Sequence, residues 1–287
     1  MSFVVRVGDV AMKIVCDERT IPSTPAGPAR LFLVDDDQAD STMTVRSAPG
    51  LTAPRGKQLF DSGLVWQLHR DRDDFVFGFH SPVFGNAPYR LARFNSAFTA
   101  GRVSIGHAPL AADVPVKPFD YPLDELLMIN LLARGRGVEI HACGVVDHDG
   151  AAYVFAGQSG AGKSTIARLW HADGATILSD DRLILRVRDG HAWVYGTPWH
   201  GEERFACPRS APLSAIYFLA HASRNSATSM SAASAAARLF ACSFPPFYDQ
   251  AGIEFTLALL ADIMRRVPAF ELKFVPDPQV TRFVRAA

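Results

Sequence analysis

The sequence has few cysteines, no excess of either charge and no long hydrophobic run. Its four cysteines lie far apart and form no CxxC pair, which argues against a disulfide framework or a zinc cluster and favours a reducing compartment. Lysine and arginine number 29, as do aspartate and glutamate, so the basic excess typical of nucleic-acid-binding proteins is missing. No apolar run approaches the roughly 20 residues that cross a bilayer, and charged residues interrupt the apolar N-terminus before a signal-peptide core forms. We therefore expect a cytoplasmic protein that binds neither nucleic acid nor membrane.

The chain contains enough apolar sequence for a core, since 48% of its 287 residues are hydrophobic and 20% are charged. Residues 1–116 carry short apolar runs between prolines and glycines, and the run 74–80 has an aromatic at every second position. This pattern predicts strands joined by loops. We interpret 1–116 as a β-rich N-terminal domain that recognises an acceptor or mediates oligomerisation. The acidic run 35–37 is interpreted as a solvated turn, with a metal site as the alternative.

Residues 117–287 have the pattern of an α/β domain. Asp120 is suited to cap a helix that stops at Gly135 and Gly137. Asp-Gly pairs at 149–150 and 189–190 predict two β-hairpins, so we expect a mixed sheet. The expected strands are 138–146, 151–155, 175–178, 183–187 and 191–195, and the expected helices follow residue 162, begin near 231 and span 253–265.

Residues 157–164 read GQSGAGKS and match the phosphate-binding pattern GxxxxGK[ST] at every fixed position. Glycines let backbone N–H groups approach phosphate oxygens, and the following helix adds its positive end. Lys163 is expected to reach the β- and γ-phosphates, and the Ser164 hydroxyl to bind Mg²⁺. The motif follows an apolar strand and opens a helix, as the pattern requires, and this context disfavours a chance match. The predicted ATP-binding residues are Gly157, Gln158, Ser159, Gly160, Ala161, Gly162, Lys163, Ser164 and Thr165.

Two adjacent aspartates, Asp180 and Asp181, follow the strand expected over 175–178. Phosphoryl transfer needs a carboxylate near Mg²⁺ and a group that orients or deprotonates the attacking oxygen. Neighbouring side chains of a strand point to opposite faces, so separate roles for the two aspartates require the strand to end at this pair. A solvated strand end without a catalytic role is the alternative.

The loop 157–164, the run 178–182 (Leu-Ser-Asp-Asp-Arg) and His141 together resemble the catalytic domain of the HPr kinase/phosphorylase family, whose fold is related to that of phosphoenolpyruvate carboxykinase. The resemblance covers about residues 120–275 and leaves the N-terminal domain unmatched. It implies an α/β, mixed-sheet P-loop kinase domain in which Asp181 is the general base, Asp180 lies near the metal and His141 stands beside the pair. On the sequence alone, His141 is also consistent with an ordinary packed or surface histidine.

The segment 195–204 departs from the signature of that family and is similar to a motif of uncharacterised HPr-kinase-like proteins. Through this resemblance, Glu202 or Glu203 would supply a second carboxylate to the metal. Trp199 and His200 would line the nucleotide or acceptor pocket, with simple loop packing as the alternative.

The sequence therefore predicts a kinase that uses ATP and Mg²⁺ and transfers the γ-phosphate to a hydroxyl, with a serine of a protein or peptide as the acceptor. One alternative is a kinase of a small metabolite. Another is a regulator that binds ATP without transferring phosphate, which would need no base aligned with a hydroxyl. A homo-oligomer formed through the N-terminal domain is a further option.

Overall fold

The computed structural model describes residues 1–17, 21, 24–25, 27–113 and 116–286. The chain forms two compact units, Met1–Leu131 and Leu132–Ala287. None of the helices in the described ranges is long and apolar enough to cross a bilayer.

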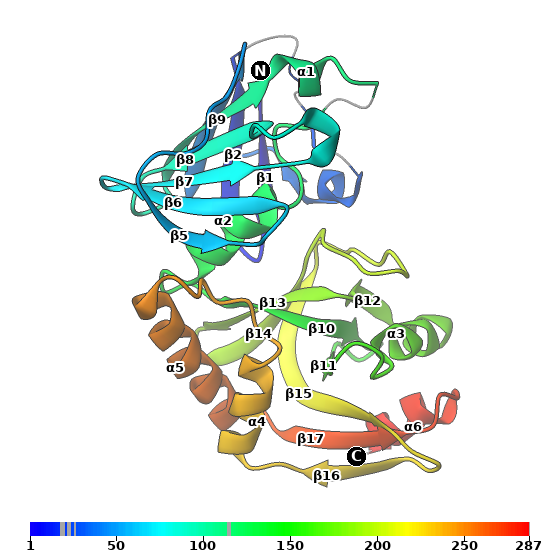
Figure 1. Cartoon of the computed structure of the whole chain (residues 1–287). Helices are drawn as coiled ribbons and strands as arrows, with labels where there is room; N and C mark the ends of the chain where they lie inside the picture. The colour runs from blue at the N-terminus through cyan, green and yellow to red at the C-terminus, as the bar shows by residue number, and fades with distance from the viewer. Residues whose placement is uncertain (18–20, 22–23, 26, 114–115, 287) are drawn as a thin grey trace. The chain divides into compact units, whose positions relative to one another are not determined.

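The first unit is built on a sheet, the N-terminal sheet, whose described strands follow the order β3-β1-β2-β4-β9-β8-β7-β6-β5 (Figure 1). The pairs β2–β4 and β4–β9 are parallel, and the other neighbours are antiparallel. The strands are β1 (Ser2–Val7), β2 (Val10–Cys16), β3 (Leu33–Val34), β4 (Ser41–Ala48), β5 (Lys57–Asp61), β6 (Trp66–Asp71), β7 (Asp74–Phe79), β8 (Arg90–Phe94) and β9 (Ala100–Gly106). Short helical turns lie at η1 (Gly27–Phe32), η2 (Pro82–Phe84) and α1 (His107–Leu110).

The aromatic alternation of β7 serves the core of this unit. Phe77 and Phe79 are fully buried, and the ring of Phe77 packs against Phe94 and Phe98. The acidic run 35–37 lies outside this core, where Asp36 pairs with Arg6 at 2.5 Å. In the described ranges, no three His, Cys, Asp or Glu side chains form a group that could hold a metal ion.

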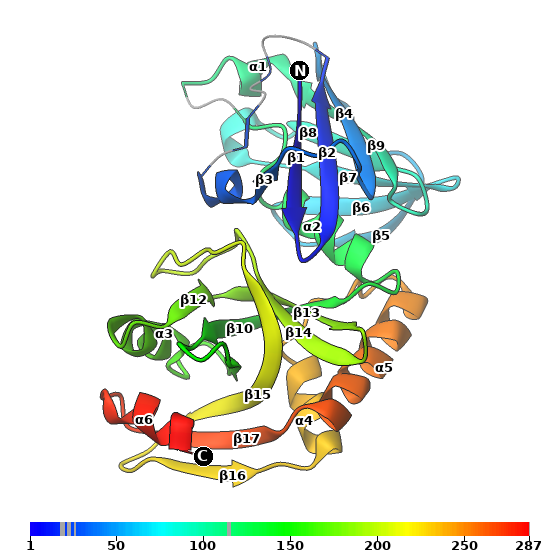
Figure 2. The same ribbon diagram turned by 180° about the vertical axis from the view of Figure 1, so that it is seen from behind.

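The helix α2 (Leu123–Leu132) groups with the first unit, so the chain divides later than the boundary predicted between residues 116 and 117. The helix is apolar around most of its circumference, with Leu127 and Met128 buried. The helix is drawn behind β5 and β6 in Figure 1 and behind β1 and β2 in Figure 2, which shows the opposite side. The helix α2 therefore lies inside the curve of the N-terminal sheet. Just before the helix, Asp120 pairs with the buried Arg90 of β8. These contacts join the helix to the N-terminal sheet.

The second unit has its own sheet, the C-terminal sheet, with the described order β11-β10-β13-β14-β15-β17-β16. A further pairing of β11 with β15 closes part of this path, and β12 pairs with β10. The strands are β10 (Val138–Val146), β11 (Ala152–Ala156), β12 (Thr176–Ser179), β13 (Arg182–Arg188), β14 (His191–Gly196), β15 (Ser210–His221), β16 (Ser226–Ser229) and β17 (Ala269–Phe274). The helices are α3 (Lys163–Ala172), α4 (Ala232–Phe240), α5 (Gln250–Arg266) and α6 (Gln279–Ala286).

Both predicted hairpins are present, and the C-terminal sheet is mixed, as predicted. The turn at 147–150 joins β10 to β11 in antiparallel pairing, while β11 is parallel to β15. The second turn joins β13 to β14 and has positive φ at both Asp189 and Gly190. This is the conformation that Asp-Gly favours in tight hairpins.

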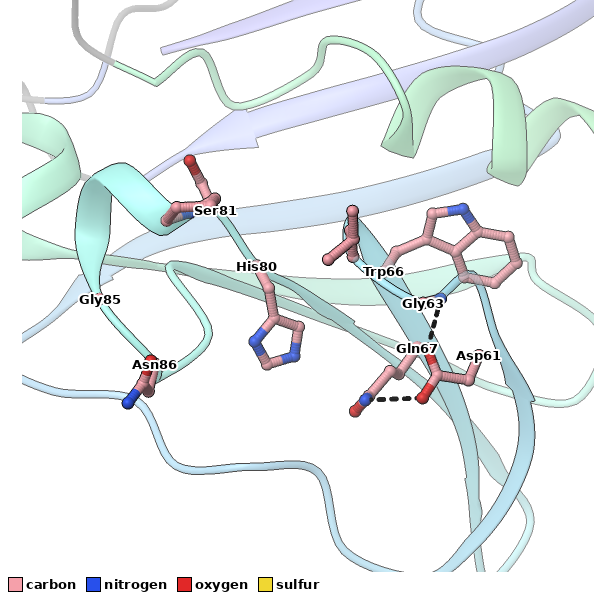
Figure 3. Close-up of a pocket in the computed structure, with 10 residues that line it drawn as sticks. Asp61, Gly63, Trp66, Gln67, His80, Ser81, Gly85 and Asn86 are labelled. Atoms are coloured by element: carbon pink, nitrogen blue, oxygen red, sulfur yellow. Dashed lines mark hydrogen bonds between the residues drawn. The ribbon is translucent and has the colours of Figure 1, made fainter.

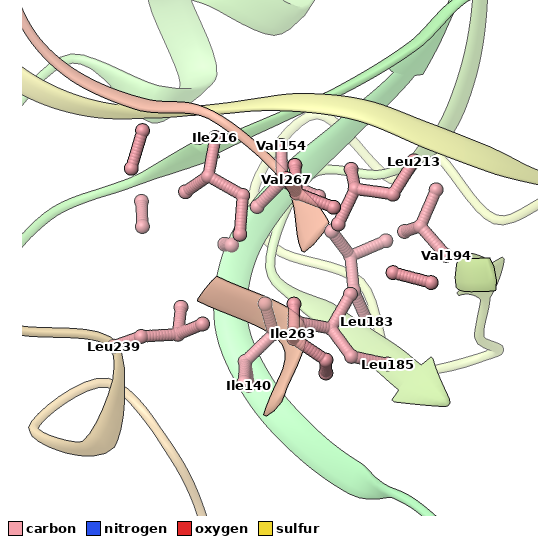
Figure 4. Close-up of a cluster of buried hydrophobic side chains, with 14 of the residues drawn as sticks. Ile140, Val154, Leu183, Leu185, Val194, Leu213, Ile216, Leu239, Ile263 and Val267 are labelled. Atoms are coloured by element: carbon pink, nitrogen blue, oxygen red, sulfur yellow. The ribbon is translucent and has the colours of Figure 1, made fainter. Parts of the chain in front are cut away.

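Helices cover both faces of the C-terminal sheet, which makes the unit an α/β structure. One face packs on α4 and α5 through a cluster that includes Ile216, Leu239 and Ile263 (Figure 4). The other face packs on α3 and α6 through a cluster that includes Trp170 and Val284. The expected helices near 231 and over 253–265 correspond to α4 and α5. The sequence pattern did not predict β15, β17 or α6.

Candidate functional site

The loop 157–164 joins β11 to α3. Gly160 and Gly162 have φ of +80° and +101°, in the region that favours glycine. A Cβ at Gly162 would lie 2.6 Å from Cζ of Phe274, and one at Gly157 would lie 2.7 Å from Cβ of Ala161. The glycines of the motif are therefore demanded by backbone conformation and by close packing.

Lys163 is the first residue of α3 and is only 7% exposed. Its Nζ donates to the carbonyl oxygens of Gly157 at 2.8 Å and Gln158 at 3.1 Å, so the ammonium lies within the curve of its own loop. Burial lowers the pKa of Lys163, and the negative charge of Asp181 opposes that shift. The amine and the Asp181 carboxylate are thus near enough to influence each other's ionisation.

Three side chains from distant parts of the sequence support the loop. His221, at the end of β15, donates from Nε2 to the carbonyl of Gly160 at 2.8 Å. Phe274, at the end of β17, lies against Gly162. Burial raises the pKa of the Cys242 thiol, and the backbone N–H of Gly157 lies near enough to oppose that rise. Sequence reasoning missed all three, because none belongs to a local motif.

The strand β12 ends at Ser179, as separate roles for the two aspartates require. The Ser179 Oγ accepts hydrogen bonds from the N–H groups of Asp181 and Arg182, each at 3.2 Å, and donates to the carbonyl of Trp199 at 3.0 Å. This hydroxyl turns the chain just past the strand. Asp180 and Asp181 consequently have different surroundings.

The Asp180 carboxylate is buried, at 2% exposure, and holds a nearby turn. Its Oδ1 accepts from the N–H of Gly201 and its Oδ2 from the N–H of Glu203, each at 3.0 Å. A Cβ at position 201 would lie 2.8 Å from Asp180 Oδ2, so the close approach needs glycine there. Asp180 therefore positions the segment 201–203 in addition to any role toward a metal.

The half-buried Asp181 meets His141 of β10 and its own neighbour Arg182. Asp181 Oδ1 lies 2.9 Å from Nδ1 of His141, and Oδ2 accepts from Nη1 of Arg182 at 2.6 Å. The same Nη1 lies 2.9 Å from His141 Nδ1, so the protonation of His141 decides whether its Nδ1 donates to Asp181 or accepts from Arg182. The structure thus brings the predicted residues His141 and Asp181 into contact.

Neighbouring groups hold Asp181 ionised. Burial raises the pKa of its carboxyl. The hydrogen bond from His141 and the charges of Arg182 and Lys163 lower that pKa by more than burial raises it, so the net shift is downward. Arg182 is itself fixed, because its Nε lies 3.5 Å from Oε1 of the buried Glu139 and its guanidinium stacks 4.4 Å from the ring of Phe244.

The other predicted residues are less closely gathered. Ser164 and Thr165 are half-buried in the first turn of α3, Glu203 lies 3.4 Å from Arg168, and Glu202 is exposed. His200 Nδ1 bonds the carbonyl of Gly201 at 2.9 Å. Within the described residues, the predicted set of Ser164, Asp180, Glu202 and Glu203 does not include three acidic side chains that form a metal-holding group.

The comparisons with known proteins match the chain to a family model and to solved structures. No curated protein matches the chain. A solved structure, the Hpr(Ser) kinase/phosphatase from Coxiella burnetii, covers 52% of this chain and 94% of its own, with 11% identity and a TM-score of 0.31, a value that does not establish a common fold. A family model described as SynChlorMet cassette protein ScmC matches residues 124–274, more than half of the chain, and the chain therefore belongs to the ScmC family.

Proposed function

We propose that this protein is a kinase that transfers the γ-phosphate of ATP to a hydroxyl group, with a serine of a polypeptide as the acceptor. The observation that carries the proposal is the Asp181 carboxylate, held ionised beside Lys163 of the glycine-rich loop and bonded to His141 and Arg182. A loop that only binds nucleotide has no need for such a carboxylate. A kinase needs one to orient and deprotonate the attacking hydroxyl.

The loop fits nucleotide phosphates. Gly160 and Gly162 adopt positive φ and add no side chain to the loop, and the Lys163 ammonium projects into the curve of this loop. Backbone N–H groups of such a loop and the positive end of α3 favour anions. Residues 157–165 would hold the phosphates, with Lys163 exchanging its carbonyl partners for phosphate oxygens.

The Ser164 hydroxyl would hold Mg²⁺ together with phosphate oxygens and one acidic side chain, for which Asp180, Glu202 and Glu203 remain the predicted choices. When bound, the ion neutralises charge on the transferring phosphate. Mg²⁺ keeps several waters and uses few protein ligands in such sites.

In the transfer step the acceptor oxygen forms a bond to the γ-phosphorus while the bond from that phosphorus to the β–γ bridging oxygen breaks. The hydroxyl proton passes to Asp181, and ADP leaves. Arg182 and His141 hold the Asp181 carboxylate in place through contacts of 2.6 and 2.9 Å, and both therefore act on the base by positioning it.

Labelling from [γ-³²P]ATP tests the proposal. Purified protein, Mg²⁺, the labelled nucleotide and a lysate of the native host are combined, and labelled species are separated and identified by mass spectrometry. We expect an acid-stable phosphoserine on a polypeptide, absent with Lys163→Ala and strongly reduced with Asp181→Asn. Label on a small molecule would identify a metabolite kinase instead. Release of inorganic phosphate with no labelled acceptor would support the regulator or ATPase interpretation.

A further inference from the structure

The N-terminal unit contains a hollow of about 300 Å³ that is lined by four arginines. It lies between the segment 52–55 and the strands β4, β7, β8 and β9. The arginines are Arg46, Arg55, Arg93 and Arg102, and we call this hollow the arginine pocket. The catalytic proposal assigns it no role.

The strand register concentrates the charges. Arg93 of β8 is directly opposite Arg102 of β9, and Arg46 of β4 is opposite Ser104, two positions along β9 from Arg102. Like charges directly opposite each other in a sheet are destabilising. The sheet thus accepts an unfavourable pairing at this place, as binding sites commonly do.

Two of the four charges are not compensated by any residue that the structure describes. Arg93 is paired with Asp71 and Asp74, the latter at 3.0 Å. Arg55 lies near enough to Asp71 for its charge to lower the pKa of that carboxyl. The side chains of Arg46 and Arg102 make no hydrogen bond or ion pair with any residue that the structure describes. Both residues line the hollow, and their guanidinium donors are available to a ligand.

The pocket is a formed feature with apolar walls. Pro54, Val76 and Leu91 line it beside the arginines. Pro54 approaches the sheet so closely that a Cβ at Gly78 would lie 2.9 Å from its Cγ, so the segment 52–55 is seated on β7 at the one position without a side chain. A ligand therefore meets both donors for an oxyanion and apolar surface for methylene groups.

We propose that the arginine pocket binds carboxylate side chains of an acidic polypeptide segment. Guanidinium groups bind carboxylates through paired hydrogen bonds, and the apolar walls suit the aliphatic part of glutamate or aspartate. Nucleic acid is less suited, because its phosphates need an extended basic track, and the chain has equal numbers of basic and acidic residues. If the proposed function holds, this segment belongs to the acceptor, whose recognition is one of the two roles predicted for the N-terminal domain.

Another hollow of the same unit shows the contrast (Figure 3). It measures about 350 Å³ and is lined by Asp61, Trp66, Gln67 and His80 among others. The Asp61 carboxylate there accepts hydrogen bonds from the Gln67 side chain at 3.0 Å and the Gly63 N–H at 2.7 Å. A carboxylate on the wall disfavours a second one, so an acidic ligand is directed to the arginine pocket.

Fluorescence anisotropy with a fluorescein-labelled peptide of alternating glutamate and glycine tests the proposal at low ionic strength, without nucleotide. The full-length protein is compared with the double variant Arg46→Gln/Arg102→Gln. The control is Lys57→Gln, which removes one exposed charge of the same unit outside the pocket. We expect the double variant to bind at least about tenfold more weakly, since a charge-assisted hydrogen bond is worth roughly that factor, and the control to bind as the parent protein does.

Equal affinity of the double variant and the parent, with matching melting temperatures, would overturn the proposal. So would tighter binding of a single-stranded oligonucleotide than of the peptide, if that binding also required Arg46 and Arg102. Lys163→Ala should bind the peptide normally, because Lys163 belongs to the nucleotide loop. Peptide binding without any phosphate transfer would therefore support the pocket while refuting the proposed kinase activity.

Discussion

Asp181 Oδ1 lies 2.9 Å from Nδ1 of His141, although the two residues are 40 positions apart in the sequence. The contact arises because β10 carries His141 past the end of β12, where the Ser179 hydroxyl turns the chain and exposes Asp181. Position on two neighbouring strands, and not proximity in sequence, assembles this pair.

Replacing Lys163 with alanine should abolish phosphate transfer or weaken binding of Mg·ATP while leaving the fold intact. The amine projects into its own loop, where its partners are two carbonyl oxygens that a bound phosphate would replace. Calorimetric titration with Mg·ATP measures the effect. Lys273→Ala is the matched control, since Lys273 is half-exposed and lies 3.9 Å from its nearest acid, Glu271. Unchanged affinity and turnover in Lys163→Ala would refute the assignment of the loop.

Asp181→Asn should retain nucleotide binding and lose transfer. Asparagine keeps the size of the side chain but cannot accept the proton of the acceptor hydroxyl, so transfer should fall by about 10²–10⁴-fold. The lower end is expected, because a loose transition state needs little proton removal. Initial rates of phosphoserine formation give the ratio. Asp189→Asn, at the exposed hairpin turn between β13 and β14, should retain the full rate. Full activity of Asp181→Asn would place the base elsewhere.

His141→Ala should shift the acid limb of the pH–rate profile to higher pH. The hydrogen bond from His141 lowers the pKa of Asp181, so its removal raises that pKa and leaves less ionised base at weakly acidic pH. In the parent protein the rate should persist to pH values below the ordinary aspartate pKa of about 4. Profiles of kcat/KM for the two proteins test this. A variant profile that loses height without moving along the pH axis would show that His141 does not tune the base.

Asp180→Asn should destabilise the C-terminal unit. One carboxylate oxygen that accepts a backbone N–H becomes an amide donor, so either Gly201 or Glu203 loses its partner in a buried place. Leaving a buried donor unsatisfied costs about 1–3 kcal/mol. Urea unfolding provides the value. Asp181→Asn, on the half-exposed neighbour, is the comparison and should cost less. A variant as stable as the parent would mean that the 201–203 turn is held by other contacts.

Arg285→Gln should lower stability at neutral pH and make it less sensitive to acid. Arg285 of α6 bonds Asp147 at 2.7 and 2.8 Å and Asp173 at 2.5 Å, and the hydrogen bond from Arg285 is the main cause that lowers the pKa of each carboxyl. A carboxyl whose pKa is lower in the folded state than in the unfolded state stabilises the fold at pH values above its unfolded-state pKa of about 4. This stabilisation is lost as the pH falls through the folded-state pKa. The variant lacks this contribution at every pH.

We expect a loss of about 1–3 kcal/mol at pH 7, where removal of Arg285 leaves the buried Asp147 without its charged partner. Urea unfolding at pH 7 and near pH 3 compares the two proteins, whose stabilities should converge in acid. Arg282→Gln, an exposed neighbour on α6, serves as control. Parallel pH curves for parent and variant would contradict the linkage.

The sequence by itself determined the local features of this protein. Asp189-Gly190 specifies a hairpin because both residues must adopt positive φ, and the apolar run of β10 specifies a buried strand. The motif 157–164 predicted a strand before it and a helix after it, and β11 and α3 occupy these places. These inferences succeed because the interactions that decide them lie within a few residues.

Only the tertiary structure decided what surrounds the loop and to which unit α2 belongs. The pairing of β11 with β15 brings His221 to Gly160, and the next strand brings Phe274 to Gly162, across separations that leave no local pattern. The arginine pocket likewise exists because strand register places Arg93 opposite Arg102. Such contacts depend on which strands pair and in which register. The pairing and the register are decided by how the whole core is buried, so no short stretch of sequence reveals them.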